Sequence, residues 1–222
     1  AAELVILIGT DHYGSDLFTL TRQSYATPLG LLPTAAAVVD ELAAAVGEQA
    51  AFGGELRHLR EHSLELVAVW LQHARQGRPV ETVPLLVGGL HRFFADSTGP
   101  AGDGRIRKFV EAVQRYASTR PTLIVASGDL AHVGPAFGGA GLDDASRALL
   151  RAADDGLLER MAAGDGEGFY QAIRRVQDRN NVCGLTPGYL TLKILGEGTR
   201  GDLLAYDTCP ADDADTSAVT IG

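Results

Sequence analysis

Two separated segments of the sequence each place an Asp and a His beside glycine, and these residue types could carry metal or acid–base chemistry. The first segment contains Asp11 and His12, and the second contains Asp129 and His132. A neutral imidazole is a good ligand for iron, copper or zinc, and a nearby carboxylate can fix its tautomer. His132 could equally act as a general base that Asp129 orients. The alternative is that both Asp residues only cap turns.

The sequence has two cysteines, and the surroundings of one of them suggest chemistry. Cys183 stands just before a helix that begins at Pro187, where a thiolate could bind a soft or borderline metal. From the local sequence alone, a buried structural thiol is the simpler interpretation. Cys209 lies near an acidic loop, and its local sequence gives less reason to assign it a function. We expect both thiols to be reduced in a cytoplasm, because the sequence shows no export signal.

A third pattern, His58–His62, matches the inverted zinc-peptidase motif H-x-x-E-H, in which two His bind zinc and a Glu activates water. Glu61 and Glu65 also lie one helical turn apart. A five-residue pattern often arises by chance and needs a further carboxylate on a following helix, so the peptidase is the less favoured alternative. The glycines of Gly138–Gly141 do not join a strand to a helix, and we therefore expect no nucleotide cofactor.

The elements that must position these residues alternate between strands and helices. Apolar runs with β-branched residues predict strands over Leu4–Ile8, Val80–Val87, Thr122–Ala126, Asp202–Tyr206 and Ala218–Ile221, the first three buried on both faces. Apolar residues at three- and four-residue steps predict helices over Thr34–Val46, His62–His73, Arg105–Ala117, Asp143–Met161, Glu167–Val176 and Pro187–Leu195. This order predicts an α/β fold with a mostly parallel central sheet, covered by helices on both faces, in one domain over residues 1–222.

In open α/β sheets, functional sites lie beyond the carboxyl ends of the strands. The first predicted strand leads directly to His12, and the third leads to His132. We therefore expect the loops at His12 and His132 to face one pocket, together with Glu61, His62 and Cys183.

Charge and hydropathy exclude some classes of partner. The formal net charge is −9 and the basic residues are scattered, which disfavours binding to a nucleic-acid backbone. The longest apolar runs are too short to cross a bilayer. We expect a small molecule or a peptide as ligand, no nucleic acid and no membrane, and a homo-oligomer is left open.

Six motifs in the same order resemble the Memo family, which includes the bacterial and archaeal proteins called AmmeMemoRadiSam system protein B. The motifs are Gly9–His12, Thr27–Gly30, Glu61–Glu65, Val83–Gly88, Ser127–Gly134, and Val182–Gly184 followed by Pro187. The resemblance covers most of the chain. It implies a fold similar to that of the class III extradiol dioxygenases.

The resemblance also implies a pocket that holds iron or copper, with His12 and Cys183 as metal ligands. His132 would take the place of the dioxygenase base, and Asp129 would form a polar wall together with Glu61 and His62. The implied activity is redox or oxygen-linked chemistry on an unassigned substrate, with a functional link to a radical SAM protein. The alternative function is a non-catalytic module that recognises a peptide or a small anion in the same pocket.

The sequence departs from the family pattern in one respect. The family's other His ligand lies in an upstream Pro-His-Ala-Gly-Tyr segment, and no such segment precedes Leu4. We therefore expect the chain to lack this segment and to hold a metal weakly or not at all. The dioxygenases also use a carboxylate where this sequence has Cys183, so ring cleavage itself is not expected.

Overall fold

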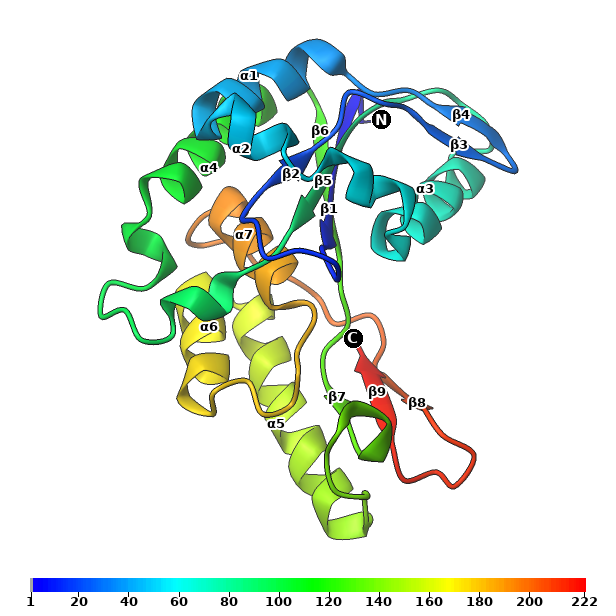
Figure 1. Cartoon of the computed structure of the whole chain (residues 1–222), viewed down its shortest axis with the longest axis vertical. Helices are drawn as coiled ribbons and strands as arrows, with labels where there is room; N and C mark the ends of the chain where they lie inside the picture. The colour runs from blue at the N-terminus through cyan, green and yellow to red at the C-terminus, as the bar shows by residue number, and fades with distance from the viewer. Residues whose placement is uncertain (1) are drawn as a thin grey trace. The chain divides into compact units, whose positions relative to one another are not determined.

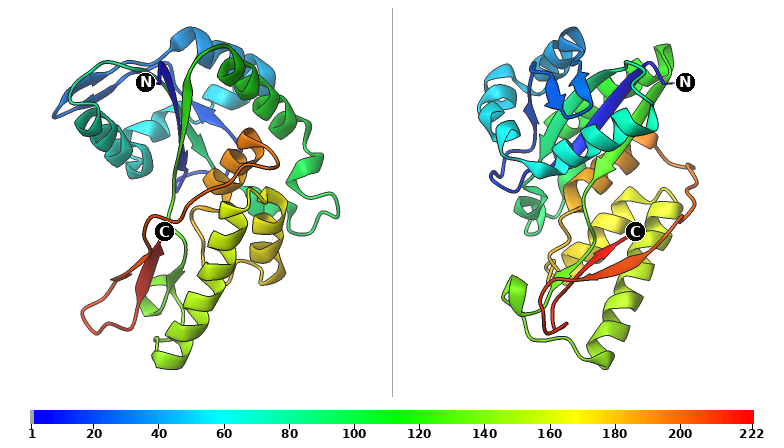
Figure 2. Two further views of the ribbon diagram at one scale, coloured as in Figure 1. Left: turned by 180° about the vertical axis from the view of Figure 1, so that it is seen from behind. Right: turned by 90° about the vertical axis from the view of Figure 1, so that its right-hand side faces the viewer.

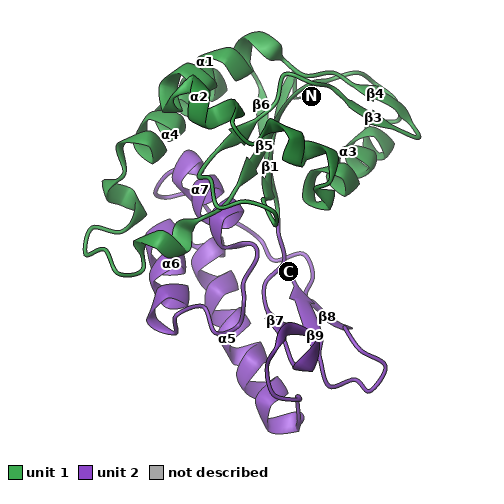
Figure 3. Cartoon of the chain, viewed as in Figure 1, with its two compact units in different colours: residues 1–127 green, residues 128–222 purple. Residues whose placement is uncertain are grey.

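The computed structural model describes residues 2–222 (Figures 1 and 2). The chain divides into two compact units, Ala1–Ser127 and Gly128–Gly222 (Figure 3). The division separates the segment that carries His12 from the segment that carries His132, and the expectation of a single domain stays a prediction. Among residues 2–222, none of the helices combines the length and the hydrophobicity that a membrane span requires.

A four-stranded, mostly parallel sheet forms the centre of the first unit. Strand β1 (Leu4–Thr10) lies between β5 (Glu81–Val87) and β6 (Thr122–Ser127) and runs parallel to both. Strand β2 (Thr19–Leu20) pairs antiparallel with β5 at the edge. Residues Leu4–Ile8 are fully buried, because β1 has a strand on either side and packed side chains on both faces. The predicted parallel sheet is confirmed.

Helices cover both faces of this sheet (Figures 1 and 2). Helix α3 (His62–Ala74) packs on one face, whereas α1 (Ala36–Val46) and α4 (Gly104–Thr119) contact each other on the opposite face. Alternate strand residues and residues one helical turn apart form the core beneath α3, namely Val5, Leu7, Leu64, Ala68 and Leu86. The alternation of a β-strand directs Leu4 and Ile6 to the other face.

The remaining elements of the first unit are short. Strands β3 (Tyr25–Thr27) and β4 (Gly30–Leu32) form an antiparallel hairpin. The short helices are α2 (Glu48–Phe52), η1 (Glu55–Leu59), η2 (Leu90–Phe93) and η3 (Pro100–Gly102). Gly30 has a φ of 116°, a conformation that a residue with a side chain rarely adopts, so the tight hairpin turn requires glycine here.

The second unit combines three helices with a small antiparallel sheet. The helices are α5 (Asp144–Ala162), α6 (Gly166–Arg175) and α7 (Leu185–Leu195). The sheet has the order β7 (His132–Val133), β9 (Ala218–Ile221) and β8 (Asp207–Pro210), and the short helix η4 spans Pro135–Phe137. Phe169 and Tyr170 of α6 are fully buried with Tyr189 of α7, which packs these two helices together.

The predicted strand over Asp202–Tyr206 is wrong, because these residues have no regular structure. The Tyr206 hydroxyl donates to Asp154 Oδ2 of α5 at 2.9 Å, and the guanidinium carbon of Arg151 lies 4.0 Å from the centre of the Tyr206 ring. Side-chain contacts with α5 therefore hold this segment in place of strand pairing. Leu204 is 95% exposed, so the apolar run does not form a buried strand.

Two other strand predictions need correction. Ala218–Ile221 is a strand, but it pairs antiparallel with β7 and β8 and does not join the parallel sheet. Strand β6 was expected to be buried on both faces, yet Leu123 is 44% exposed. It lies at the edge of the four-stranded sheet, with β1 as its one neighbour in that sheet.

Candidate functional site

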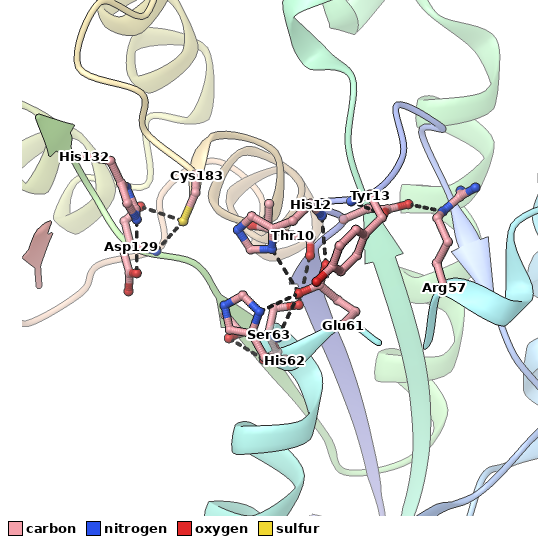
Figure 4. Close-up of polar contacts among 12 residues, drawn as sticks. Thr10, His12, Tyr13, Arg57, Glu61, His62, Ser63, Asp129, His132 and Cys183 are labelled. Carbon is pink, nitrogen blue, oxygen red and sulfur yellow. Dashed lines mark hydrogen bonds and ion pairs between the residues drawn. The ribbon is translucent and has the colours of Figure 1, made fainter. Parts of the chain in front are cut away.

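The end of β1 brings His12 against the first turn of α3 (Figure 4). Gly9 allows this approach, because a Cβ atom there would lie 2.5 Å from Ser63 Oγ and 2.7 Å from a methyl carbon of Leu64. The Ser63 hydroxyl then donates to the carbonyl oxygen of Thr10 at 2.9 Å. A larger residue at position 9 would separate the His12 loop from α3.

His12, Glu61 and His62 form the first group of side chains that could hold a metal ion. His12 Nδ1 lies 2.9 Å from Glu61 Oε1, and His62 Nδ1 lies 3.3 Å from the same oxygen. The two imidazole rings stack with their centres 4.8 Å apart. Glu61 is also the N-cap of α3, since it accepts the backbone N–H of Ser63 at 3.0 Å. One carboxylate thus orients His12 and begins the helix that carries His62.

Glu61 is buried and ionised, whereas His12 and His62 are exposed. Burial raises the pKa of the Glu61 carboxyl group, but hydrogen bonds from the backbone N–H groups of His12 and Ser63 and from the His12 ring outweigh burial and lower it. An ionised carboxylate only accepts hydrogen bonds, so Nδ1 of His12 carries the proton. In the neutral imidazole, Nε2 of His12 then keeps its lone pair, which is the tautomer that a metal ligand needs.

Asp129, His132 and Cys183 form the second group, within the second unit. The backbone N–H of Asp129 donates to Cys183 Sγ at 3.0 Å, and the N–H of Gly184 donates to the Asp129 carbonyl at 2.8 Å. A Cβ atom at Gly184 would lie 2.7 Å from that carbonyl oxygen, so glycine permits the contact. His132 Nε2 lies 3.6 Å from Asp129 Oδ2. The loop before α7 thereby brings the thiol to the segment that carries His132.

Asn181 fixes the orientation of His132. The Asn181 carbonyl lies 3.2 Å from His132 Nδ1, and the Asn181 side-chain amide donates to the His132 carbonyl at 3.0 Å. Asn181 has a φ of 49°, in the left-handed region that Asn tolerates better than most residues. Because a carbonyl oxygen only accepts, Nδ1 of His132 carries the proton. In the neutral imidazole, Nε2 then carries the lone pair and lies near Asp129.

All six predicted site residues fall into these two groups. His12, Glu61 and His62 come together in the first unit, and the other three come together in the second. The convergence of His12 and Cys183 on one pocket stays a prediction, because these residues belong to different units.

The peptidase pattern is not formed as the motif requires. His58 lies in η1, whereas α3 begins at His62, so the two imidazoles do not share one helix. The Nε2–H of His58 donates to the Thr19 carbonyl at 3.0 Å, and Nδ1 accepts the Tyr25 hydroxyl at 2.8 Å. Burial lowers the pKa of His58, which favours this neutral form. Both nitrogens are occupied, and His58 links the segment at β2 to β3.

Asp11 plays a different part from the one expected. The carboxylate beside the His12 ring is Glu61, whereas Asp11 accepts the backbone N–H of Tyr13 at 3.1 Å and Arg57 Nε at 2.7 Å. Sequence reasoning missed Arg57 altogether. A buried, ionised carboxylate favours a cationic or hydrogen-bonding partner, but the sequence does not say that Arg57 provides it for Asp11.

Comparisons with known proteins cover almost the whole chain. A model of the family described as Memo-like protein matches residues 1–221. A MEMO1 family protein of Nitrosopumilus maritimus (strain SCM1) is 28% identical over 222 residues, which cover 98% of this chain and 70% of the relative. A MEMO1 family protein of Thermococcus onnurineus (strain NA1) is 26% identical over 219 residues, covering 93% of this chain and 69% of the relative. The chain therefore belongs to the Memo-like protein family.

Proposed function

We propose that this chain binds iron or copper through His12 and Cys183 and uses it in redox or oxygen-linked chemistry on a small molecule or peptide. The observation that carries the proposal is the 2.9 Å contact between His12 Nδ1 and the buried Glu61 carboxylate. This contact orients the ring and, in the neutral imidazole, leaves the lone pair on the other nitrogen, Nε2. Outer-shell carboxylates of this kind are typical partners of metal-binding histidines.

The available donor atoms fit these two metals. Imidazole nitrogen and thiolate sulfur are the ligands that borderline and soft transition metals prefer. Cys183 Sγ accepts the Asp129 N–H at 3.0 Å, which holds the sulfur in place, and a metal would bind this sulfur as the thiolate. When bound, iron or copper would supply one-electron or oxygen chemistry.

His132 supplies a proton acceptor under this proposal. Its Nδ1–H is held by the Asn181 carbonyl, so Nε2 is available to take a proton from a bound substrate. The Asp129 carboxylate, 3.6 Å from Nε2, would stabilise the imidazolium that forms. The role of Glu61 is to keep the neighbouring imidazole of His12 in one orientation.

Metal content after dialysis tests the proposal. The protein is loaded with Fe²⁺ without oxygen, or with Cu²⁺, and then dialysed against metal-free buffer. With two ligands credited, the unmodified chain should retain only part of the metal, and we expect His12→Ala and Cys183→Ser to lose most of that part. His73→Ala is the matched control, because His73 is an exposed imidazole on α3 outside both groups. Equal retention by His12→Ala and His73→Ala would refute the assignment of His12.

A further inference from the structure

The loop between β1 and β2, which carries His12 and is called the His12 loop below, contains a buried carboxylate that needs a partner. The Asp11 side chain is fully buried, and an isolated buried carboxylate is strongly unfavourable. Arg57 supplies the partner, with its Nε 2.7 Å from Asp11 Oδ2. The Arg57 side chain is itself 22% exposed, so this pair is shielded from most of the solvent.

The same guanidinium group also holds the far end of the loop. Arg57 Nη2 lies 2.5 Å from Asp16 Oδ2 and 2.8 Å from Thr19 Oγ1. One planar group therefore joins the residue before His12 to a residue four positions after it. A lysine could not make these contacts together, because its ammonium is a single point charge on a flexible chain.

Two glycines show how closely the backbone packs against Arg57. A Cβ atom at Gly14, inside the loop, would lie 2.6 Å from the guanidinium carbon. A Cβ atom at Gly54 would overlap the same group. The Arg57 guanidinium is therefore packed tightly against the backbone. A flexible ion pair on the surface, by contrast, contributes little to stability.

His12 lies between two anchored points. Glu61 binds the ring and the backbone N–H of His12 (Figure 4). Arg57 binds the preceding residue, Asp11. Arg57 lies in η1 and Glu61 is the N-cap of α3, so both anchors come from one short stretch of the chain. The loop would lose one of its two attachments to this stretch if the guanidinium were removed.

We propose that Arg57 is a positioning residue for His12, because it binds Asp11 and Asp16 at once and fixes the loop on which the imidazole is presented. This inference rests on the proposed function only for the claim that His12 is a metal ligand. The claim that Arg57 orders the loop stands on contacts within the first unit.

Amide hydrogen exchange of the metal-free protein tests the ordering of the loop. The N–H of His12 donates to Glu61 at 2.8 Å and the N–H of Tyr13 donates to Asp11 at 3.1 Å, so both should be protected. We expect Arg57→Ala to speed their exchange at least about tenfold, while the amides of β1 and β5 change little. Arg105→Ala is the matched control, because it removes an arginine–aspartate contact of equal length, 2.7 Å, at the start of α4.

Binding of Cu²⁺ to the same variants tests the link to His12. Loss of a group that hydrogen-bonds to a metal ligand typically weakens metal binding about 10–100-fold. Arg57 contacts His12 only through Asp11, so we expect Arg57→Ala to weaken binding by about tenfold, the lower end of this range. Arg57→Lys keeps the charge and should fold even where the alanine variant does not. It should recover part of both effects, since it can contact one carboxylate at a time.

The outcomes separate the two claims. Unchanged exchange at His12 and Tyr13 in both variants at position 57 would overturn the proposal. So would an equal rise across β1 and β5, which would mean that Arg57 stabilises the whole unit. Faster loop exchange with unchanged Cu²⁺ affinity would also overturn it. A chain that binds no Cu²⁺ even unmodified would count against the proposed function, and the exchange result alone would then decide the role of Arg57.

Discussion

Removal of the Glu61 carboxylate should destabilise the first unit more than a surface substitution does. Glu61→Ala removes the N-cap of α3, which is typically worth about 1 kcal/mol. It also leaves the His12 backbone N–H and ring without their charged acceptor, and a hydrogen bond to a charged group contributes about 1.5–3 kcal/mol. Because the Glu61 side chain is fully buried, no water replaces it directly. We expect a total loss of about 2.5–4 kcal/mol.

Urea unfolding followed by tryptophan fluorescence measures this loss. Trp70 is the single tryptophan and lies on α3, so its signal reports on the first unit. Glu65→Ala is a matched control, because Glu65 is an exposed Glu of the same helix. If Glu61→Ala unfolds at the same urea concentration as Glu65→Ala, the assignment of Glu61 as the anchor is refuted.

The pH dependence gives a second test of the same carboxylate. The pKa of Glu61 is lowered in the folded state, so its ionised form stabilises the protein above the unfolded pKa of about 4.3. This stabilisation is lost as the pH falls through the lower, folded pKa. The free-energy difference between the unmodified chain and Glu61→Gln should therefore shrink below about pH 4. A difference that stays constant down to pH 3 would contradict this reasoning.

Three further predictions concern other contacts. Gly9→Ala should cost about 1–3 kcal/mol in urea unfolding, because its Cβ atom would meet Ser63 at 2.5 Å, and a cost near zero would contradict the close approach. His58→Gln should lower the thermal unfolding temperature but leave bound metal unchanged, since both ring nitrogens make structural contacts. Loss of metal in the folded variant would favour the peptidase interpretation. Burial raises the pKa of Asp154, so its stabilisation is present below the unfolded pKa and lost as the pH rises through the folded pKa. Asp154→Asn should therefore gain thermal stability relative to the unmodified chain between about pH 4 and 7, and a constant difference would argue against the raised pKa.

The sequence predicts the main helices and the parallel strands well, because their signal is local. Helix α3 begins at His62, as predicted, since the apolar spacing continues without a break from there. Strand β1 is recognisable because all its central residues are apolar and buried. The segment Asp202–Tyr206 shows the limit of this signal, because a short apolar run does not reveal whether a partner strand is present.

The sequence predicts which residues form the candidate site, but it does not predict which of them contact one another. Strand-end position and residue type identify His12 and His132, and they suggest their carboxylate neighbours. They do not reveal that Glu61 rather than Asp11 orients His12, or that the Asn181 carbonyl fixes His132. Those contacts depend on how a distant helix or loop packs, which no local pattern records.

X-ray absorption at the metal edge tests the central claim most directly. The chain is loaded with Fe²⁺ or Cu²⁺ and compared with its Cys183→Ser, Cys209→Ser and His12→Ala variants. We predict a sulfur contribution that Cys183→Ser abolishes and Cys209→Ser retains, because Cys209 lies outside both groups of candidate ligands among residues 2–222. We also predict an imidazole contribution that His12→Ala weakens. A spectrum that neither Cys183→Ser nor His12→Ala changes would contradict the account.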